Sequence, residues 1–234
     1  MGLFVERYPE RPFPSRKQSV FNIHGRSGDI VIDEDAFSNV TQSYDVYIKG
    51  GSSGFQAKAT AIANWLLTPN GYADLTDSYD ATVVRKARFI GGVSFLNALN
   101  KYGKATITFD CCPQRYPVAP ETLSSFLGNS VTIPTVANIM PAYPLVVLNG
   151  CAVHSAGSVQ TDSVTITFTA LQTFHTKIYI DFETGAIYDD NGNTLSEFSV
   201  SGTFTKLGSG DVITTSCSTT PLPYYTVYTR RWYL

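Results

Sequence analysis

Segments in which an apolar residue occupies every second position recur along the chain. They include residues 44–49, 164–168 and 178–182. Because successive side chains of a β-strand point to opposite faces, each segment is predicted to be a strand with one buried face. Three further strands are predicted over 83–89, 93–99 and 105–109. The prevailing pattern is therefore that of a mainly β chain.

One segment has the period of a helix. Its apolar face consists of Phe55, Ala59, Ile62 and Leu66. These spacings of three and four predict a helix over about 53–67. Ser52 or Ser53 is able to cap its start, and the sequence Thr-Pro-Asn-Gly at 68–71 ends it because proline cannot continue the hydrogen-bond ladder. A helix this short is expected to gain its stability by packing on a sheet.

A proline-rich stretch around Pro117 divides the pattern into two parts. We place a domain boundary there, with domains at 1–116 and 117–234. The first domain is predicted to be β-rich with the single helix. In the second, short strands separated by turns such as 190–193 follow one another without a helix, which is typical of a β-sandwich.

The N-terminal residues favour contacts with other chains. Residues 1–20 are rich in proline and charge, which predicts an extended arm lying across another surface. Charged residues make up 15% of the chain and hydrophobic residues 43%, which favours either surface buried against partners or simply a β-rich domain with a polar, uncharged face. The strand at 44–49 is expected to present an unpaired edge that a neighbour completes. The candidate oligomer contacts are Tyr8, Arg11, Arg16, Lys17, Tyr44 and Tyr47.

Charge and hydropathy argue against nucleic acid and membranes as partners. The formal net charge is -2 and the basic clusters are short, whereas phosphate binding needs clustered Lys and Arg. No apolar run reaches the roughly 18–20 residues of a membrane span. The N-terminus also lacks the apolar region of a secretory signal, so synthesis in a cytosol is expected.

The candidate catalytic pairs fail on spacing. Cys151 and His154 are three residues apart, which places them on opposite faces of a strand. Asp181 and Glu183 share one strand face, but nothing in the sequence marks a cleft around them, so a solvated face is the favoured interpretation. No catalytic residue is therefore predicted.

Metal and phosphate motifs are also incomplete. The four cysteines include no CxxC spacing, so a zinc site is not expected and the thiols are predicted to be reduced and to act as small hydrophobes. The acidic turn at 189–193 lacks the later glutamate of a calcium loop at the required spacing. The glycine-rich run at 50–54 lacks the GK[ST] ending of a phosphate-binding loop. Neither a metal nor a cofactor is predicted.

A series of short motifs resembles, in its order and spacing, a known family. In the first part the motifs are 25–29 (Gly-Arg-Ser-Gly-Asp), 44–48, 65–66, 71–72, 75–77, 108–111 and 115–116. In the second part they are 178–181, Tyr188, 191–193, 202–204, 207–210 and 231–232. The first set is similar to the belt domain of phage distal tail proteins, and the second is similar to their galectin-like β-sandwich. Residues 121–160 depart from the pattern.

This resemblance implies a structural virion protein and not an enzyme. It implies a hexameric ring that forms the hub at the distal end of a long non-contractile tail, at the tip of the virion, after synthesis in the bacterial cytoplasm. The tail tube protein would meet one face of the ring and the tail-associated hub or lysin protein the other, with receptor-binding proteins as further partners. An alternative function is a carbohydrate-binding adsorption module, for which Trp232 is the candidate residue.

Overall fold

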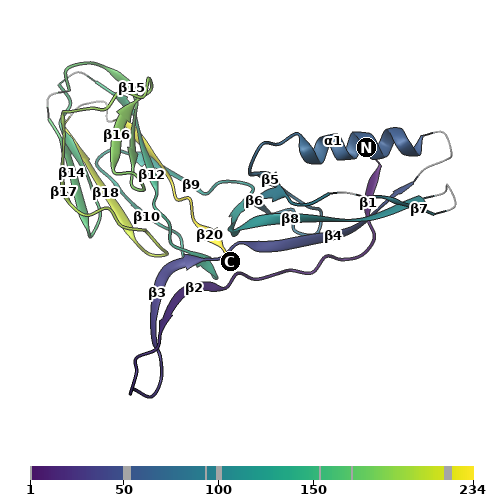
Figure 1. Ribbon diagram of the computed structural model, residues 1–234. Helices are drawn as coiled ribbons and strands as arrows, with labels where there is room; N and C mark the ends of the chain where they lie inside the picture. The colour runs from purple at the N-terminus through teal and green to yellow at the C-terminus, as the bar shows by residue number, and fades with distance from the viewer. Residues whose placement is uncertain are drawn as a thin grey trace. The chain divides into compact units, whose positions relative to one another are not determined.

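The computed structural model describes residues 2–49, 54–92, 94–98, 102–152, 154–169, 171–218 and 223–234. Antiparallel strands dominate these residues, and α1 (Phe55–Leu67) is the helix among them (Figure 1). The mainly β fold class is therefore confirmed. The chain divides into unit 1, Met1–Arg115 together with Leu234, and unit 2, Tyr116–Tyr233. The functional domains assigned to 1–116 and 117–234 stay a prediction.

Unit 1 is built around the long strand β8 (Tyr102–Pro117). The strand β4 (Val40–Lys49) pairs with β8 along its whole length, from Val40 opposite Cys111 to Lys49 opposite Tyr102. Four further strands of this sheet lie in unit 1. The strand β1 (Leu3–Val5) pairs with β4, β6 (Val83–Phe89) and β7 (Leu96–Ala98) pair with β8, and β5 (Ala73–Leu75) pairs with β6. On β4, Tyr44, Val46 and Ile48 are buried, as the alternation predicted.

The expectation of an unpaired edge at 44–49 is wrong. The N-terminal strand β1 pairs with the second edge of β4, with Leu3, Phe4 and Val5 opposite Ile48, Tyr47 and Val46. The backbone N–H of Glu6 continues the ladder to the carbonyl of Asp45, at 2.7 Å. The start of the predicted arm thus satisfies the backbone groups of β4 within the chain, because exposed ladder groups gain from any available partner.

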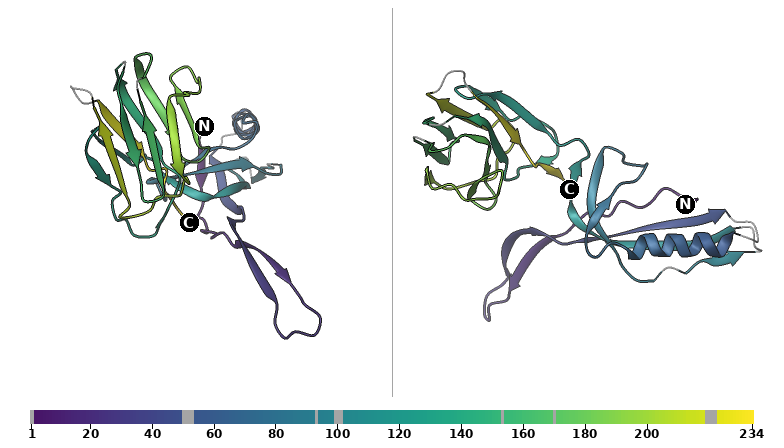
Figure 2. Two further views of the ribbon diagram at one scale, coloured as in Figure 1. Left: turned by 90° about the vertical axis from the view of Figure 1, so that its left-hand side faces the viewer. Right: turned by 90° about the horizontal axis from the view of Figure 1, so that it is seen from above.

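The helix α1 lies across one face of the sheet of unit 1 (Figure 2). Its residues Ile62 and Leu66 are buried in the same cluster as Val46, Ile48 and Ile107 of the sheet. The helix begins after Gly54, which provides no side-chain cap, and the predicted caps Ser52 and Ser53 lie outside the described residues.

The start of α1 approaches β8 closely at a glycine. A Cβ atom added to Gly103 would lie 2.3 Å from the ring of Phe55, well inside van der Waals contact. The absence of a side chain at this position therefore lets the Phe55 ring rest on the strand backbone.

The strands β2 (Arg16–Phe21) and β3 (Ile30–Phe37) form a separate two-stranded sheet in unit 1. The hairpin stands away from the other strands of the unit (Figures 1 and 2). The predicted turn at 25–29 lies at its tip, where Gly25 and Gly28 have φ angles of 80° and 86°. Glycine adopts this left-handed region without strain, which explains its place in the turn.

Unit 2 contains two five-stranded antiparallel sheets and a short strand pair. The order of the first sheet is β10 (Ser130–Thr132), β18 (Val212–Cys217), β13 (Gly157–Gln160), β14 (Val164–Phe168) and β17 (Phe198–Gly202). The order of the second is β16 (Ala186–Asp189), β15 (His175–Asp181), β12 (Leu145–Cys151), β19 (Tyr224–Tyr228) and β9 (Thr122–Phe126). The additional pair joins β11 (Ile139–Met140) to β20 (Trp232–Tyr233).

The two five-stranded sheets share one core. Ile166 and Phe168 of the first sheet lie in one buried cluster with Ile178 and Ile180 of the second sheet. The cluster also contains Phe182, the residue that follows β15. These are the alternating apolar positions. The strand predicted at 164–168 coincides with β14, and the strand predicted at 178–182 corresponds to β15, which begins earlier and ends at Asp181. The arrangement is that of a β-sandwich, while its galectin-like character stays a prediction.

Other predicted elements differ in extent. The strand predicted at 83–89 coincides with β6, and the strand at 105–109 is the middle of the longer β8. Of the strand predicted at 93–99, the structure describes β7 at Leu96–Ala98, and residues 93 and 99 lie outside the described part. The described residues include no helix long and apolar enough to traverse a membrane.

Candidate functional site and interaction surfaces

The hairpin β2–β3 concentrates exposed apolar side chains. The register places Val20 opposite Val31 and Phe21 opposite Ile30. Because paired residues share a face and neighbours along a strand alternate, Val20 and Val31 lie on one face while Phe21, Ile30 and Ile32 lie on the other. Val20, Phe21, Val31 and Ile32 are each more than half exposed, at 52–59% of their full surface.

Polar contacts within the hairpin hold its two strands together. Arg16 Nη1 lies 2.6 Å from Asp33 Oδ2, and Ser19 donates a hydrogen bond to Glu34 at 2.8 Å. An isolated two-stranded hairpin is only marginally stable in water. A hairpin with apolar residues on both faces therefore has the features of a surface that another molecule covers.

The N-terminal segment that follows β1 is attached to a loop of unit 1. The Tyr8 ring lies edge-on to Tyr79, with centroids 4.7 Å apart. Arg11 donates to the Tyr8 hydroxyl at 2.8 Å and to the Tyr79 carbonyl at 3.1 Å. A hollow of about 360 Å³ with mainly polar lining separates residues 7–12 from β4 and β8. The segment is thus attached at a few points instead of packing closely along its length.

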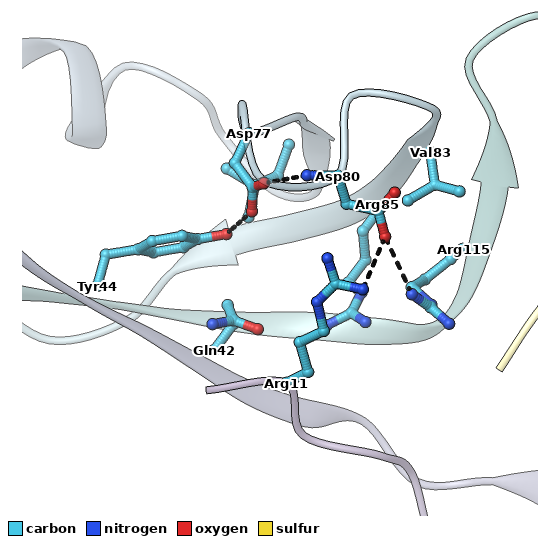
Figure 3. Close-up of a pocket in the computed structure, with 9 residues that line it drawn as sticks. Arg11, Gln42, Tyr44, Asp77, Asp80, Val83, Arg85 and Arg115 are labelled. Carbon is cyan, nitrogen blue, oxygen red and sulfur yellow. Dashed lines mark hydrogen bonds and ion pairs between the residues drawn. The ribbon is translucent and has the colours of Figure 1, made fainter. Parts of the chain in front are cut away.

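Beneath this segment lies a smaller polar pocket of about 50 Å³ (Figure 3). Its charged and hydroxyl side chains are Arg11, Tyr44, Asp77, Asp80, Arg85 and Arg115. The Tyr44 hydroxyl donates to Asp77 at 2.7 Å. Burial, followed by this hydrogen bond and the charge of Asp77, raises the pKa of Tyr44, so the hydroxyl remains a neutral donor.

The six candidate contact residues make various contacts within the subunit. Tyr44 is buried in the core, and Tyr47 stacks on Phe4 with ring centroids 5.4 Å apart. Arg16 pairs with Asp33, and Lys17 is exposed on the hairpin. Tyr8 and Arg11 join the N-terminal segment to the loop at 79–80. Their role in an oligomer interface stays a prediction.

The exposed apolar faces of the hairpin were not predicted, although the sequence contains one signal of them. The run Ile30-Val31-Ile32 is continuously apolar, which is also the pattern of a buried strand. Only the register shows that these residues alternate between two exposed faces.

The cysteine–histidine pair considered above does not form. His154 lies beyond the end of β12 and is exposed, whereas the register partner of Cys151 is His175 on β15. Burial raises the pKa of the Cys151 thiol to about 12. A thiol that stays protonated near neutral pH is a poor nucleophile, so this neighbourhood offers no activated thiolate.

The solvated face expected for Asp181 and Glu183 is wrong for Asp181, which is buried. Arg230 Nη1 lies 3.0 Å from Asp181 Oδ1 and 3.6 Å from Glu183 Oε2. Asp181 also accepts the backbone N–H of Glu183 at 3.0 Å, which shapes the turn after β15. The two carboxylates thus share one cation in a structural contact.

The acidic turn at 189–193 likewise has a structural explanation. The Asp189 carboxylate accepts the backbone N–H groups of Asn193 and Asn191, both at 2.9 Å, and these bonds hold its pKa below the usual range. Gly192, with a φ of 81°, completes the turn. Within the described ranges no three His, Cys, Asp or Glu side chains are grouped so as to hold a metal ion. Of the glycine-rich run at 50–54, residues 50–53 lie outside the described part.

The outer face of the second sheet of unit 2 is rich in aromatic side chains. Tyr224 pairs with Phe126, and each is more than half exposed. On the other side of β12, Tyr179 and Tyr188 stack with centroids 5.2 Å apart. The candidate Trp232 lies elsewhere, on β20, where it is half-buried opposite Met140. Its sugar-binding role stays a prediction.

A solved structure of a phage protein has a fold similar to that of this chain. The Dit protein of phage SPP1, described as a paradigm of the hub adsorption apparatus in phages that infect Gram-positive bacteria, superposes with a TM-score of 0.69. The match covers 98% of this chain and 93% of the SPP1 chain at 13% identity. The resemblance to distal tail proteins is thereby confirmed at the level of the fold.

Other comparisons add little. A chain of the phage P2 baseplate in its activated conformation with Ca matches over 97% of this chain and 90% of its own length, at 9% identity and a TM-score of 0.46, which is too low to support an argument. No protein-family model matches the sequence, and no curated protein matches it significantly.

Proposed function

We propose that this chain is a structural protein of a phage virion that forms the hub ring at the distal end of the tail and links the tail tube to the host-adsorption apparatus. The observation that carries the proposal is the fold similarity to SPP1 Dit over 98% of the chain. Similarity over both units supports equivalence of the whole chain, not of one common β-module alone. The proposed location is the tail tip, and no enzymatic role is proposed.

The exposed hairpin supports a role in assembly. Full burial of a Val, Ile or Phe side chain contributes roughly 1.5–3 kcal/mol. Val20, Phe21, Val31 and Ile32 retain about half of their surface, so covering them would contribute about 3–6 kcal/mol before the costs of association. A stable interface buries roughly 1,200–2,000 Å², so the hairpin would form only a part of the contact.

A closed ring fits such a contact. A hairpin that docks on a different surface of a neighbour makes a head-to-tail interface, which yields either a ring or an open filament. A ring leaves no hairpin uncovered. We propose six subunits, with the tail tube protein on one face of the ring, the tail-associated hub or lysin protein on the other and receptor-binding proteins as further partners.

Electron microscopy of phage tails that carry an epitope-labelled chain tests the proposal. Label on a ring at the distal tip is the expected result. The variant Phe21→Ser/Ile32→Ser removes apolar surface from one hairpin face and should abolish incorporation into tails. The matched control Phe174→Ser/Val200→Ser changes exposed apolar residues of unit 2 and should leave incorporation unchanged. Label along the tube or on the capsid would exclude the proposed function.

Carbohydrate binding by unit 2 is the second candidate function. It is favoured by the aromatic outer face around Tyr224 and Phe126, because sugars stack on exposed aromatic rings beside polar side chains. A glycan array probed with the full chain and with the variants Tyr224→Ala and Trp232→Ala tests this function. If unit 2 binds a sugar, the full chain should bind a glycan and at least one variant should bind it more weakly. Absence of any bound glycan would leave the scaffold role alone.

A further inference from the structure

The pocket of unit 1 brings together three arginines from distant parts of the sequence. Arg11 comes from the N-terminal segment, Arg85 from β6 and Arg115 from β8, and their side chains gather beside Asp80 (Figure 3). Arg11 and Arg115 each lie within ion-pair distance of Asp80 Oδ2, at 3.4 and 3.3 Å. Arg115 also donates to the main-chain oxygen of Leu234, from Nε at 3.0 Å and from Nη2.

The carboxylates of the pocket are already engaged. One carboxylate, Asp80, serves two arginines. The other, Asp77, accepts the Tyr44 hydroxyl at 2.7 Å and the backbone N–H groups of Tyr79 and Asp80, both at 2.9 Å. Within the described ranges, no carboxylate lies within 4.0 Å of the Arg85 guanidinium. Among the arginines of the pocket, Arg85 is therefore the one without a carboxylate partner in the described residues.

The neighbours of Arg85 do not neutralise it. The Cys111 thiol lies beside the Arg85 guanidinium, and burial raises the pKa of that thiol above its ordinary value, so it remains uncharged near neutral pH. The Tyr44 hydroxyl is neutral for the same reason.

The arginines also repel one another. Burial lowers the pKa of Arg115, the positive charges of Arg85 and Arg11 lower it further, and Asp80 opposes this effect. An added negative charge between these groups would relieve the repulsion, because unscreened charges interact strongly in a partly buried site.

We propose that this pocket is a binding site for one small oxyanion with the chemistry of a carboxylate or a phosphate. The planar guanidinium fork matches both groups through paired hydrogen bonds. The volume of about 50 Å³ accepts a single such group, whereas sites for larger ligands measure roughly 300–1,000 Å³. The source is either an acidic side chain of a neighbouring protein or free phosphate. The inference does not depend on the proposed hub function.

Isothermal titration of the full chain with inorganic phosphate, and separately with acetate, tests the proposal at constant ionic strength. Saturable binding of at least one of the two anions is expected. The variant Arg85→Gln should weaken it about tenfold or more, since a charged hydrogen bond is lost. The control Arg88→Gln removes the same charge from the same strand, but Arg88 pairs with Asp110 outside the pocket and should bind as the unchanged chain does.

The choice of anion distinguishes the two sources. Tighter binding of acetate supports an acidic side chain as the natural occupant, and tighter binding of phosphate supports the free ion. If Arg85→Gln does not fold, as judged by circular dichroism, Arg85→Lys retains the charge without the fork and should still weaken binding. Failure of the folded, unchanged chain to bind either anion, or equal binding by Arg85→Gln, would overturn the proposal.

Discussion

Replacing Arg231 by methionine should strongly destabilise unit 2. Arg231 is only 2% exposed, and its guanidinium makes a two-pronged contact with Glu121 in which Nε and Nη2 lie 2.8 and 2.5 Å from the two carboxylate oxygens. Its Nη1 donates to the Pro134 carbonyl at 2.8 Å and to the Ser209 hydroxyl at 3.1 Å. One side chain thus connects four separate segments of the unit.

The expected loss in the free energy of unfolding follows from the Glu121 carboxylate, which the substitution leaves without its partner. Removing one partner of a buried pair costs about 3–5 kcal/mol because the other charge loses its compensation. The side chain of Glu121 is 23% exposed, so water can partly solvate the remaining carboxylate and we expect about 2–4 kcal/mol. A small domain is stable by roughly 5–15 kcal/mol, so this is a large share of the total.

Thermal and urea unfolding followed by circular dichroism measure the effect. We expect the midpoint of the unit 2 transition to fall by about 8–16 °C for Arg231→Met, since each kcal/mol corresponds to about 4 °C in a unit of this size. The double variant Glu121→Gln/Arg231→Met should recover part of the loss, because the isolated charge is removed. A loss below about 1 kcal/mol for Arg231→Met would refute the argument that the buried guanidinium holds these segments together.

Three further predictions concern other parts of the chain. Gly103→Ala should destabilise unit 1 by about 1–3 kcal/mol, because its methyl group would collide with the Phe55 ring; Phe55→Leu in the same chain should relieve the loss in urea unfolding. The hydrogen bond from Tyr72 holds the pKa of Asp110 below its usual range, so its stabilising effect is complete above about pH 4 and is lost as the pH falls through the lower folded-state pKa; Asp110→Asn should reduce the acid dependence of unfolding, and an unchanged dependence would count against this. Burial raises the pKa of the Cys151 thiol to about 12, so iodoacetamide should modify Cys151 much more slowly in the folded chain than in urea, as mass spectrometry of peptides would show; equal rates would contradict its burial.

Local patterns in the sequence were sufficient for much of the fold. Tyr44, Val46 and Ile48 are buried on one face of β4 because a strand turns every second side chain to the same side. The period near 3.6 likewise identified α1, whose start differs by two residues from the predicted one. Such features depend on residues a few positions apart, so the sequence by itself determines them.

The tertiary structure alone decided which segments meet. The strand β1 pairs with the edge of β4 that the sequence analysis predicted to be unpaired. The register of β12 with β15 places Cys151 beside His175 and not beside His154. The pocket arginines are separated by 74 and 30 positions, from 11 to 85 and from 85 to 115, and no short spacing predicts their meeting. The exposure of the apolar side chains on the β2–β3 hairpin could not be predicted from the sequence either. An apolar run predicts burial but does not indicate whether the covering surface belongs to the same chain.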